Sequence, residues 1–346
     1  MSAARAWTRP ILGIASALLA MCSAMTAAVA APPPSPGAPP GGRSQREVTV
    51  DALSVVKLQT RAVADARSAA TLGTEREGTG VVIDGSGLVL TIGYLILEAE
   101  TVELSTADGT TVPATVVGYD AATGFGLVRA VGQLPIKPVE IGDSSKVGTR
   151  EPVLIVGFDG VAPAYVVSRR PFVGYWEYLL DDAIYTAPAT VNWQGAALLD
   201  RERRLVGIGS LAVPDSVARG SAVPGNLFVP IDRLKPLLAD LVARGRPAGP
   251  ARPWLGVTTQ DAEGNVIVTR VATDSPADKA PLRVGDVIVA LGGQTIRGQA
   301  EFYTRLWASG AAGREIVLDV LRDGSIKRVS VKSMDRDLYY RAKPTY

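Results

Sequence analysis

Histidine, the side chain that enzymes use most often for proton transfer, is missing from this chain. Its 346 residues contain no histidine, and Cys22 is the only cysteine. Without an imidazole there is no Ser-His or Cys-His pair, and no side chain titrates near neutral pH unless its surroundings shift its pKa. The composition therefore excludes the usual serine and cysteine hydrolase chemistry and a Cys/His zinc site.

Two other kinds of chemistry are conceivable. A lysine can act as the base in a Ser-Lys dyad, but no lysine has the spacing of a known dyad motif; those considered are Lys57, Lys137 and Lys146. Carboxylates could hold a metal around Asp181-Asp182, or around Asp261 and Glu263. Adjacent acids on loops are usually solvated turn residues, and we give this explanation more weight than a metal site. We therefore predict no metal and no cofactor.

The chain is organised around residues 186–209, TAPATVNWQGAALLDRERRLVGIG. Two apolar segments, 196–199 and 205–208, flank the charged run 200–204. This pattern is typical of a β-hairpin with a solvated tip. The arginines in that tip are interpreted as solvated side chains rather than a binding patch.

Length and composition indicate folded domains. A chain of 346 residues allows two domains, and 47% apolar with 20% charged residues suits a globular protein. The net charge is +2, with basic and acidic residues interspersed. Nothing in this balance favours nucleic acid or an anionic surface as a partner.

The N-terminus has the features of a secretory signal. Residues 1–30 contain arginines, an apolar core too short for a comfortable membrane span, and the small-x-small cleavage site Ala28-Val29-Ala30. One weaker alternative is a lipoprotein box ending at Cys22, in which Met21 is large for its position. The other is an uncleaved anchor. Residues 31–47 are rich in Pro and Gly, which predicts an extended linker rather than a Pro-rich ligand.

Residues 48–245 read mainly as short strands. We expect a helix over 48–59, then strands separated by turns such as Asp84-Gly85 and Asp108-Gly109, which predict an all-β barrel or sandwich. Residues 223–245 predict a last strand followed by a helix, with Gly245 just past the end of the helix. A linker over 246–253 then leads to residues 254–333, and 334–346 form a tail.

The barrel region resembles the HtrA/Deg family of trypsin-like serine proteases. GTGVVIDGSGLVLT, starting at Gly78, is similar to a hairpin of that family, and IGDSSKVG, starting at Ile141, to its LGDS segment. Residues 254–333 resemble the PDZ domain of the same family, through WLGV at Trp254 and DSPADKAPLRVGDVIV at Asp274. The resemblance implies a trypsin-like double β-barrel followed by an α+β PDZ domain, an all-β dominated fold.

The positions that carry the catalytic triad in this family are all changed. The resemblance places Tyr94 at the histidine, Gly124 at the aspartate and Gln194 at the serine. An amide is not a nucleophile at neutral pH, and a phenol with a pKa near ~10 is a poor base. Losing a triad costs a factor of roughly 10⁶ in turnover. We therefore predict no catalytic residues and a degenerate site.

The PDZ region keeps the parts that bind peptides. The resemblance implies that the backbone amides of the Trp254–Gly256 loop hold a C-terminal carboxylate, and that the peptide adds as a strand beside Val257. The predicted peptide-binding residues are Trp254, Leu255, Gly256, Val257, Phe302 and Leu306. Phe302 and Leu306 are at least as well explained as core residues, and Trp254 as a packing residue.

We interpret the chain as a secreted, periplasmic HtrA-like pseudoprotease with a role in envelope protein quality control. Its expected partners are protein C-termini or unfolded peptides, and the resemblance implies homo- or hetero-oligomers with HtrA relatives. No nucleic acid and no membrane span after signal cleavage are expected. An active serine endopeptidase and a structural scaffold are the alternatives.

Overall fold

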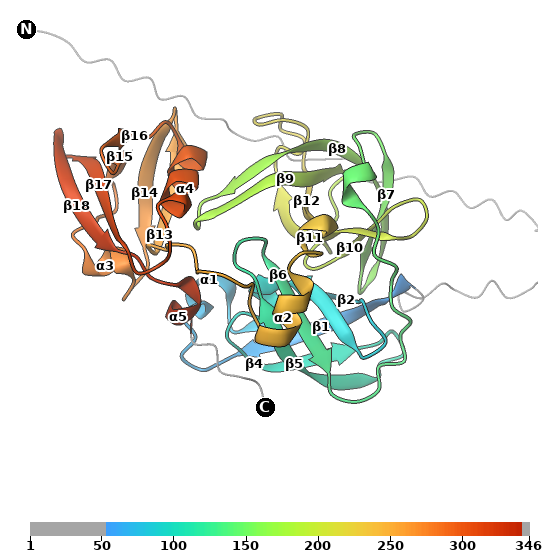
Figure 1. The fold of residues 1–346 in the computed structure, drawn as a ribbon. Coiled ribbons are helices and arrows are strands. Elements are labelled where there is room, and N and C mark those ends of the chain that lie inside the picture. Colours follow the sequence, from blue (N-terminus) through green and yellow to red (C-terminus); the bar gives the residue numbers. More distant parts are fainter. Residues whose placement is uncertain (1–52, 341–346) are drawn as a thin grey trace, which may run out of the picture. The chain divides into compact units, whose positions relative to one another are not determined.

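The computed structural model describes residues 53–340, so the predicted signal peptide and the linker over 31–47 lie outside the described residues. In the described part, strands close two barrels and a third sheet follows them (Figure 1). The predicted fold class, a double β-barrel followed by a PDZ domain, is confirmed.

The first barrel is closed by six strands in the order β1-β2-β3-β6-β5-β4. Alternate residues point inward and fill it with side chains such as Leu58, Leu104 and Phe125, all fully buried. Its strands are β1 (Val55–Ala62), β2 (Glu75–Val82), β3 (Leu88–Ile92), β4 (Ala99–Ser105), β5 (Thr111–Tyr119) and β6 (Phe125–Ala130), and a short helix α1 (Ala69–Leu72) precedes β2.

The helix predicted over residues 48–59 is wrong in its described part. Val55–Ala62 is a strand that pairs with both β2 and β4. From Val56 onward every second side chain is buried, and Lys57, Gln59 and Arg61 face outward. This period of two, with β-branched residues at its start, is a strand signal.

The second barrel is closed in the order β10-β11-β12-β9-β8-β7. The predicted hairpin is confirmed: β10 and β11 pair with Ala197 opposite Ile208, and Asp200 holds the turn by accepting the amides of Glu202 and Arg204 at 3.0 and 2.8 Å. The strands are β7 (Pro152–Gly157), β8 (Gly160–Gly174), β9 (Tyr178–Ala187), β10 (Ala197–Leu199), β11 (Leu205–Val213) and β12 (Gly225–Pro230).

The strands β8 and β9 form a hairpin longer than the others in this barrel (Figure 1). Three residues, Tyr175 to Glu177, connect them. Glu177 has a φ of 56°, in the left-handed region that costs energy for a residue with a side chain. The chain must therefore hold this tip in place by contacts elsewhere.

The predicted helix after the last strand is present but shorter. Residues Ile231–Arg233 form a 3-10 turn, and α2 spans Leu238–Arg244. Pro236 lies between them and cannot donate a backbone hydrogen bond, which explains the interruption. The helix docks on β5, where Tyr119 donates its amide to the Gly245 carbonyl at 3.0 Å.

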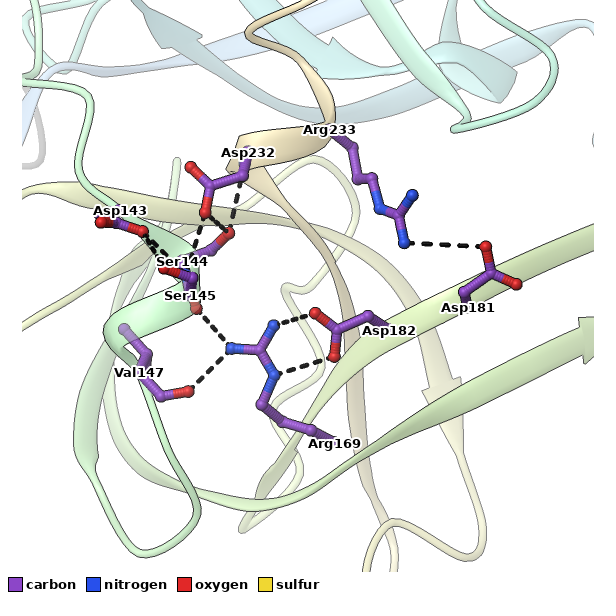
Figure 2. Close-up of polar contacts among 9 residues, drawn as sticks. All are labelled: Asp143, Ser144, Ser145, Val147, Arg169, Asp181, Asp182, Asp232 and Arg233. Atoms are coloured by element: carbon purple, nitrogen blue, oxygen red, sulfur yellow. Dashed lines mark hydrogen bonds and ion pairs between the residues drawn. The ribbon is translucent and has the colours of Figure 1, made fainter.

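Asp181 and Asp182, two of the acids considered as metal ligands, are paired with arginines (Figure 2). Arg169 holds Asp182 in a two-pronged ion pair, and Arg233 lies 3.8 Å from Asp181. Arg169 also donates to the carbonyl of Val147 at 2.8 Å. Within residues 53–340 no group of three His, Cys, Asp or Glu side chains is placed to hold a metal ion. Asp182 thus stabilises the IGDSSKVG segment through Arg169.

The PDZ domain is built on the sheet β13-β14-β15-β17-β18, with β16 beside β15. Phe302 and Leu306 of the helix α4 are fully buried against this sheet. The strands are β13 (Val257–Ala262), β14 (Asn265–Val271), β15 (Val287–Leu291), β16 (Gln294–Thr295), β17 (Glu315–Arg322) and β18 (Ser325–Lys332), and the helices are α3 (Pro276–Lys279) and α4 (Gln299–Ala308).

The described part of the tail packs on the start of the PDZ domain. Trp254 and Met334 exchange backbone hydrogen bonds of 3.0 and 3.1 Å. The helix α5 (Arg336–Tyr339) then places the ring of Tyr339 at 4.6 Å from that of Trp254. The tail thus covers the residue that opens the PDZ loop.

Candidate functional site

Tyr94 lies in the turn Gly93–Leu95, directly after β3. Its hydroxyl donates a hydrogen bond of 3.0 Å to the carbonyl of Ser210 on β11, so the side chain links the two barrels. Burial raises the pKa of Tyr94 well above its ordinary value. A phenol that stays protonated cannot accept a proton at neutral pH.

Gly124 lies beside this turn, because its carbonyl accepts the amide of Gly93 at 2.6 Å. Two of the three triad positions therefore remain neighbours. Its φ of 86° is in the range that glycine tolerates best, and a Cβ built there would lie 3.4 Å from Cδ1 of Ile92. The nearby Asp120 accepts the amide and hydroxyl of Thr123 at 2.9 and 2.6 Å, so its carboxylate serves the local turn.

The loop that carries Gln194 is fixed through its backbone. The carbonyl of Gln194 accepts the amide of Thr79 at 2.8 Å, and the amide of Gly195 donates to Gly209 at 2.9 Å. A Cβ at Gly195 would lie only 2.2 Å from the carbonyl oxygen of Thr79. The loop thus packs between β2 and β11 at a distance that only glycine allows.

The Gln194 loop lines a cavity of about 850 Å³. Tyr94 and Trp193 contribute aromatic surface to it, and Ser210 and Leu211 of β11 lie beside them. The loop is therefore shaped as part of a pocket. Neither Tyr94 nor Gln194 offers a nucleophile or a base, so these two side chains can contact a bound chain but cannot transfer its protons.

The PDZ loop has the geometry of a carboxylate site. Gly256 has a φ of 84° and lies so close to Ser275 that a Cβ would be 2.2 Å from the serine Cβ. This conformation turns the amides of Leu255, Gly256 and Val257 toward one point, where they meet a carboxylate. Three convergent amides are a common way to bind an anion.

The carboxylate held by these amides is that of Glu177, from the tip of the β8–β9 hairpin. Its Oε1 accepts from Gly256 at 2.7 Å and Val257 at 3.0 Å, and its Oε2 from Leu255 at 3.0 Å. The residue is 4% exposed. Burial raises the pKa of Glu177 to about 7, against the opposite effect of the three amides and of Arg336.

Comparisons with known proteins agree with this architecture. The family models for the trypsin-like peptidase domain and the PDZ domain match residues 78–208 and 253–333. A probable periplasmic serine endoprotease, DegP-like, of Ectopseudomonas mendocina is 27% identical over 282 residues, covering 75% of this chain and 57% of that protein. The serine endoprotease DegS of Haemophilus influenzae is 25% identical over 73% of this chain and 76% of its own length. This chain is an HtrA homologue.

Not all relatives match along their whole length. The serine protease Do-like HtrA of Bacillus subtilis is 26% identical over 157 residues, covering 40% of this chain and 33% of that protein. The chain thus spans between a third and three quarters of the length of the relatives named here, and less than two thirds of two of them. Among solved structures, the HtrA-type protease AlgW with a decapeptide aligns with a TM-score of 0.50 and 20% identity over 85% of this chain and 97% of that one. This likeness concerns the fold.

The structure places the predicted peptide-binding side chains of the HtrA homologue in its interior. Leu255, Phe302 and Leu306 are fully buried, and Val257 is 3% exposed, all in one apolar cluster. Trp254 is 6% exposed and packs on Tyr339. This burial fits the alternative of core and packing residues, whereas the loop amides do reach a carboxylate.

Three residues around the PDZ groove were missed from the sequence. Glu177 binds the loop, Thr259 donates its amide to the Tyr175 carbonyl at 2.9 Å, and Tyr303 accepts the amide of Glu177 at 3.2 Å. One signal was available: Glu177 is a charged residue inside the aromatic run Tyr175–Tyr178. A charge flanked by aromatic residues at a hairpin tip suits burial against a polar partner.

Proposed function

We propose that this HtrA homologue is a pseudoprotease that binds peptides without cutting them. Its ligands are protein C-termini or unfolded segments, recognised by the PDZ domain. The proposal rests on the residues at the three positions where the HtrA family has its catalytic triad. Tyr94 is hydrogen-bonded to Ser210, Gly124 has no side chain, and Gln194 carries an amide.

The chemistry of serine proteolysis supports this reading. A serine oxygen must lose its proton to a base that a third group orients. Tyr94 keeps its proton because burial raises its pKa, and Gln194 has no oxygen that could attack. The amides of Gly195 and Ala196 donate to the carbonyls of Gly209 and Trp193, and an amide that remains free in this loop has no nucleophile in front of it.

The cellular setting is proposed from the relatives. Several are named periplasmic endoproteases, and we place this chain in the periplasm, after removal of residues 1–30, in protein quality control. No helix within residues 53–340 has the length and apolar character to cross a membrane. We propose that the chain assembles with itself or with an active HtrA relative, and the second assembly would bring bound chains to a working protease.

The test uses purified protein starting at Ala31, with unfolded casein and a fluorogenic peptide set. A Gln194→Ala variant is assayed beside it, together with a fluorophosphonate probe that labels activated serines. We expect no cleavage and no labelling in either protein. Cleavage by the parent that disappears in the variant would contradict the proposal of a pseudoprotease and favour the active endopeptidase.

A screen of C-terminal peptides distinguishes the remaining alternative. A structural scaffold would show neither turnover nor selective peptide binding, whereas the proposed function requires binding that depends on a free carboxylate. Cleavage that survives in Gln194→Ala would place activity at another site and would also contradict the proposal.

A further inference from the structure

The tip of the β8–β9 hairpin lies in the PDZ domain as a peptide ligand would. A bound C-terminus presents a carboxylate to the loop amides, and the side chain of Glu177 presents the same chemical group. It satisfies three consecutive amides, those of Leu255, Gly256 and Val257, at 2.7–3.2 Å. A residue 78 to 80 positions earlier in the chain thus occupies the whole carboxylate loop.

The contact continues along the groove strand. Thr259 of β13 donates its amide to the carbonyl of Tyr175 at 2.9 Å, the kind of main-chain bond that a strand added beside β13 would make. From the side of α4, the Tyr303 hydroxyl accepts the Glu177 amide at 3.2 Å. Val173, near the end of β8, packs on the apolar cluster of the PDZ domain.

Beyond this contact, side chains of α4 are hydrogen-bonded to the groove strand. The side-chain amide of Gln299, on α4, donates a hydrogen bond of 2.8 Å to the Thr259 carbonyl. The hydroxyls of Tyr303 and Thr259 lie 2.8 Å apart. The hairpin tip therefore takes the polar positions that remain. An external C-terminus cannot reach the same amides while Glu177 holds them.

We propose that residues Tyr175 to Glu177 are a built-in ligand of the PDZ domain, and that a C-terminal peptide binds by displacing Glu177 from the loop. The inference rests on the peptide binding proposed above and adds its regulation. Because the competitor belongs to the same chain, its effective concentration is high, of the order of millimolar for a short tether. External peptides then bind with an apparent affinity reduced by the fraction of free groove.

The energetics favour a releasable contact over a permanent joint. Glu177 is buried without an ion-pair partner among the salt bridges of the described residues, and its φ of 56° is strained. Burial penalises its charge, which the raised pKa reflects. A peptide carboxylate that brings apolar contacts without this strain can replace it.

The experiment measures binding to the protein starting at Ala31 by fluorescence anisotropy. The probes are fluorescein-labelled peptide pools, randomised except for a fixed C-terminal residue, with a free carboxylate or as the amide. The parent is compared with Glu177→Ala and with Glu177→Gln, which keeps the size of the side chain. Glu202→Ala, at the exposed tip of the β10–β11 hairpin, is the matched control.

We expect Glu177→Ala to bind the carboxylate pools at least about tenfold more tightly than the parent. Glu202→Ala should match the parent, the amide pools should not gain, and Glu177→Gln provides the reference that does not titrate. Equal affinity of the parent and both Glu177 variants would overturn the built-in ligand but leave peptide binding intact. No binding of any pool by any of these proteins would overturn the peptide binding itself and the displacement with it.

Hydrogen exchange makes the result independent of the choice of peptide. In the parent, the amides of Leu255, Gly256 and Val257 should exchange slowly, and in Glu177→Ala they should lose protection while the β17 and β18 amides keep theirs. Equal protection of the loop amides in both proteins would contradict occupation by Glu177. Retained protection in the sheet shows that the variant is folded.

Discussion

The hydroxyl of Tyr94 and the carbonyl of Ser210 are joined by a hydrogen bond of 3.0 Å that ties the first barrel to the second. In a working protease of this fold, the region between the barrels is where a base and a nucleophile must meet. Here it holds a structural bond instead. Under the proposed function, this bond stabilises the protein at a position where an active protease has a catalytic residue.

We expect Tyr94→Phe to lower the free energy of unfolding by about 1 kcal/mol, because the ring stays while the bond to Ser210 is lost. Urea unfolding followed by fluorescence measures it. Tyr165→Phe is the control, since Tyr165 is 57% exposed and should change little. Equal effects of the two substitutions would contradict a bridging role for Tyr94.

Replacing Gly124 with the aspartate that a rebuilt triad needs should destabilise the protein. Its φ of 86° strains any residue with a Cβ, and we expect Gly124→Ala to cost about 1 kcal/mol or more. Gly85→Ala is the matched control, because no atom lies within 4 Å of a Cβ there. Thermal unfolding of both variants compares them.

The same strain limits restoration of activity. A variant with Tyr94→His, Gly124→Asp and Gln194→Ser should cleave casein far more slowly than an active HtrA protease assayed beside it, because the Gly124 backbone does not suit the new carboxylate. Cleavage at a comparable rate would show that the backbone has kept the catalytic geometry.

Much of the architecture could be predicted because local sequence patterns, such as turn residues between apolar segments, indicate it. The Asp-Gly turn beginning at Asp84 and the charged tip after Leu199 separate apolar strands, and both hairpins are confirmed. The β1 strand was mistaken for a helix because its first apolar residues, Val55 and Val56, are adjacent. Pro236 shortens a helix whose apolar spacing continues through it.

The contact of Glu177 with the PDZ loop could not be predicted in this way. The partners are 78 to 80 residues apart, and no local periodicity relates them. The candidate loop was found because Gly256 and its neighbours match a known pattern. What fills the loop depends on the length of β8 and β9, which only the folded chain reveals.

The buried pair of Asp286 and Arg322 should support the PDZ domain. Asp286 is 1% exposed and accepts two bonds of 2.6 Å from Arg322, besides the amide of Arg283 at 2.8 Å. Asp286→Asn removes the negative charge and leaves the positive charge of Arg322 without its partner. We expect the free energy of unfolding to fall by about 3 kcal/mol.

The surface pair of Asp181 and Arg233 provides the comparison for that variant. The Asp181 side chain is 71% exposed and lies 3.8 Å from the arginine, so Asp181→Asn should cost less than about 1 kcal/mol. Urea unfolding of both variants tests the difference. A larger loss for Asp181→Asn than for Asp286→Asn would contradict the importance of burial.

The binding of external peptides should depend on pH through Glu177. Burial raises its pKa from 4.5 to about 7 in the docked hairpin. Between these values the docked form holds a proton that the released form lacks, so docking is favoured at low pH and weakens as the pH rises through this window. The charged and titratable groups that act on Glu177 are Arg336 of α5 and Tyr303 of α4, neither of which changes charge below about pH 9.

The measurement is the ratio of the peptide dissociation constants of the parent and Glu177→Gln from about pH 5 to about pH 7.5. Taking the ratio removes the titration of the peptide itself, which both proteins share. We expect the ratio to fall by roughly tenfold as the pH rises, because the ionised Glu177 leaves the loop more readily. A ratio that stays constant would show that the hairpin does not release a proton when the peptide enters, and a ratio that increases would mean that the three amides outweigh the penalty of burial.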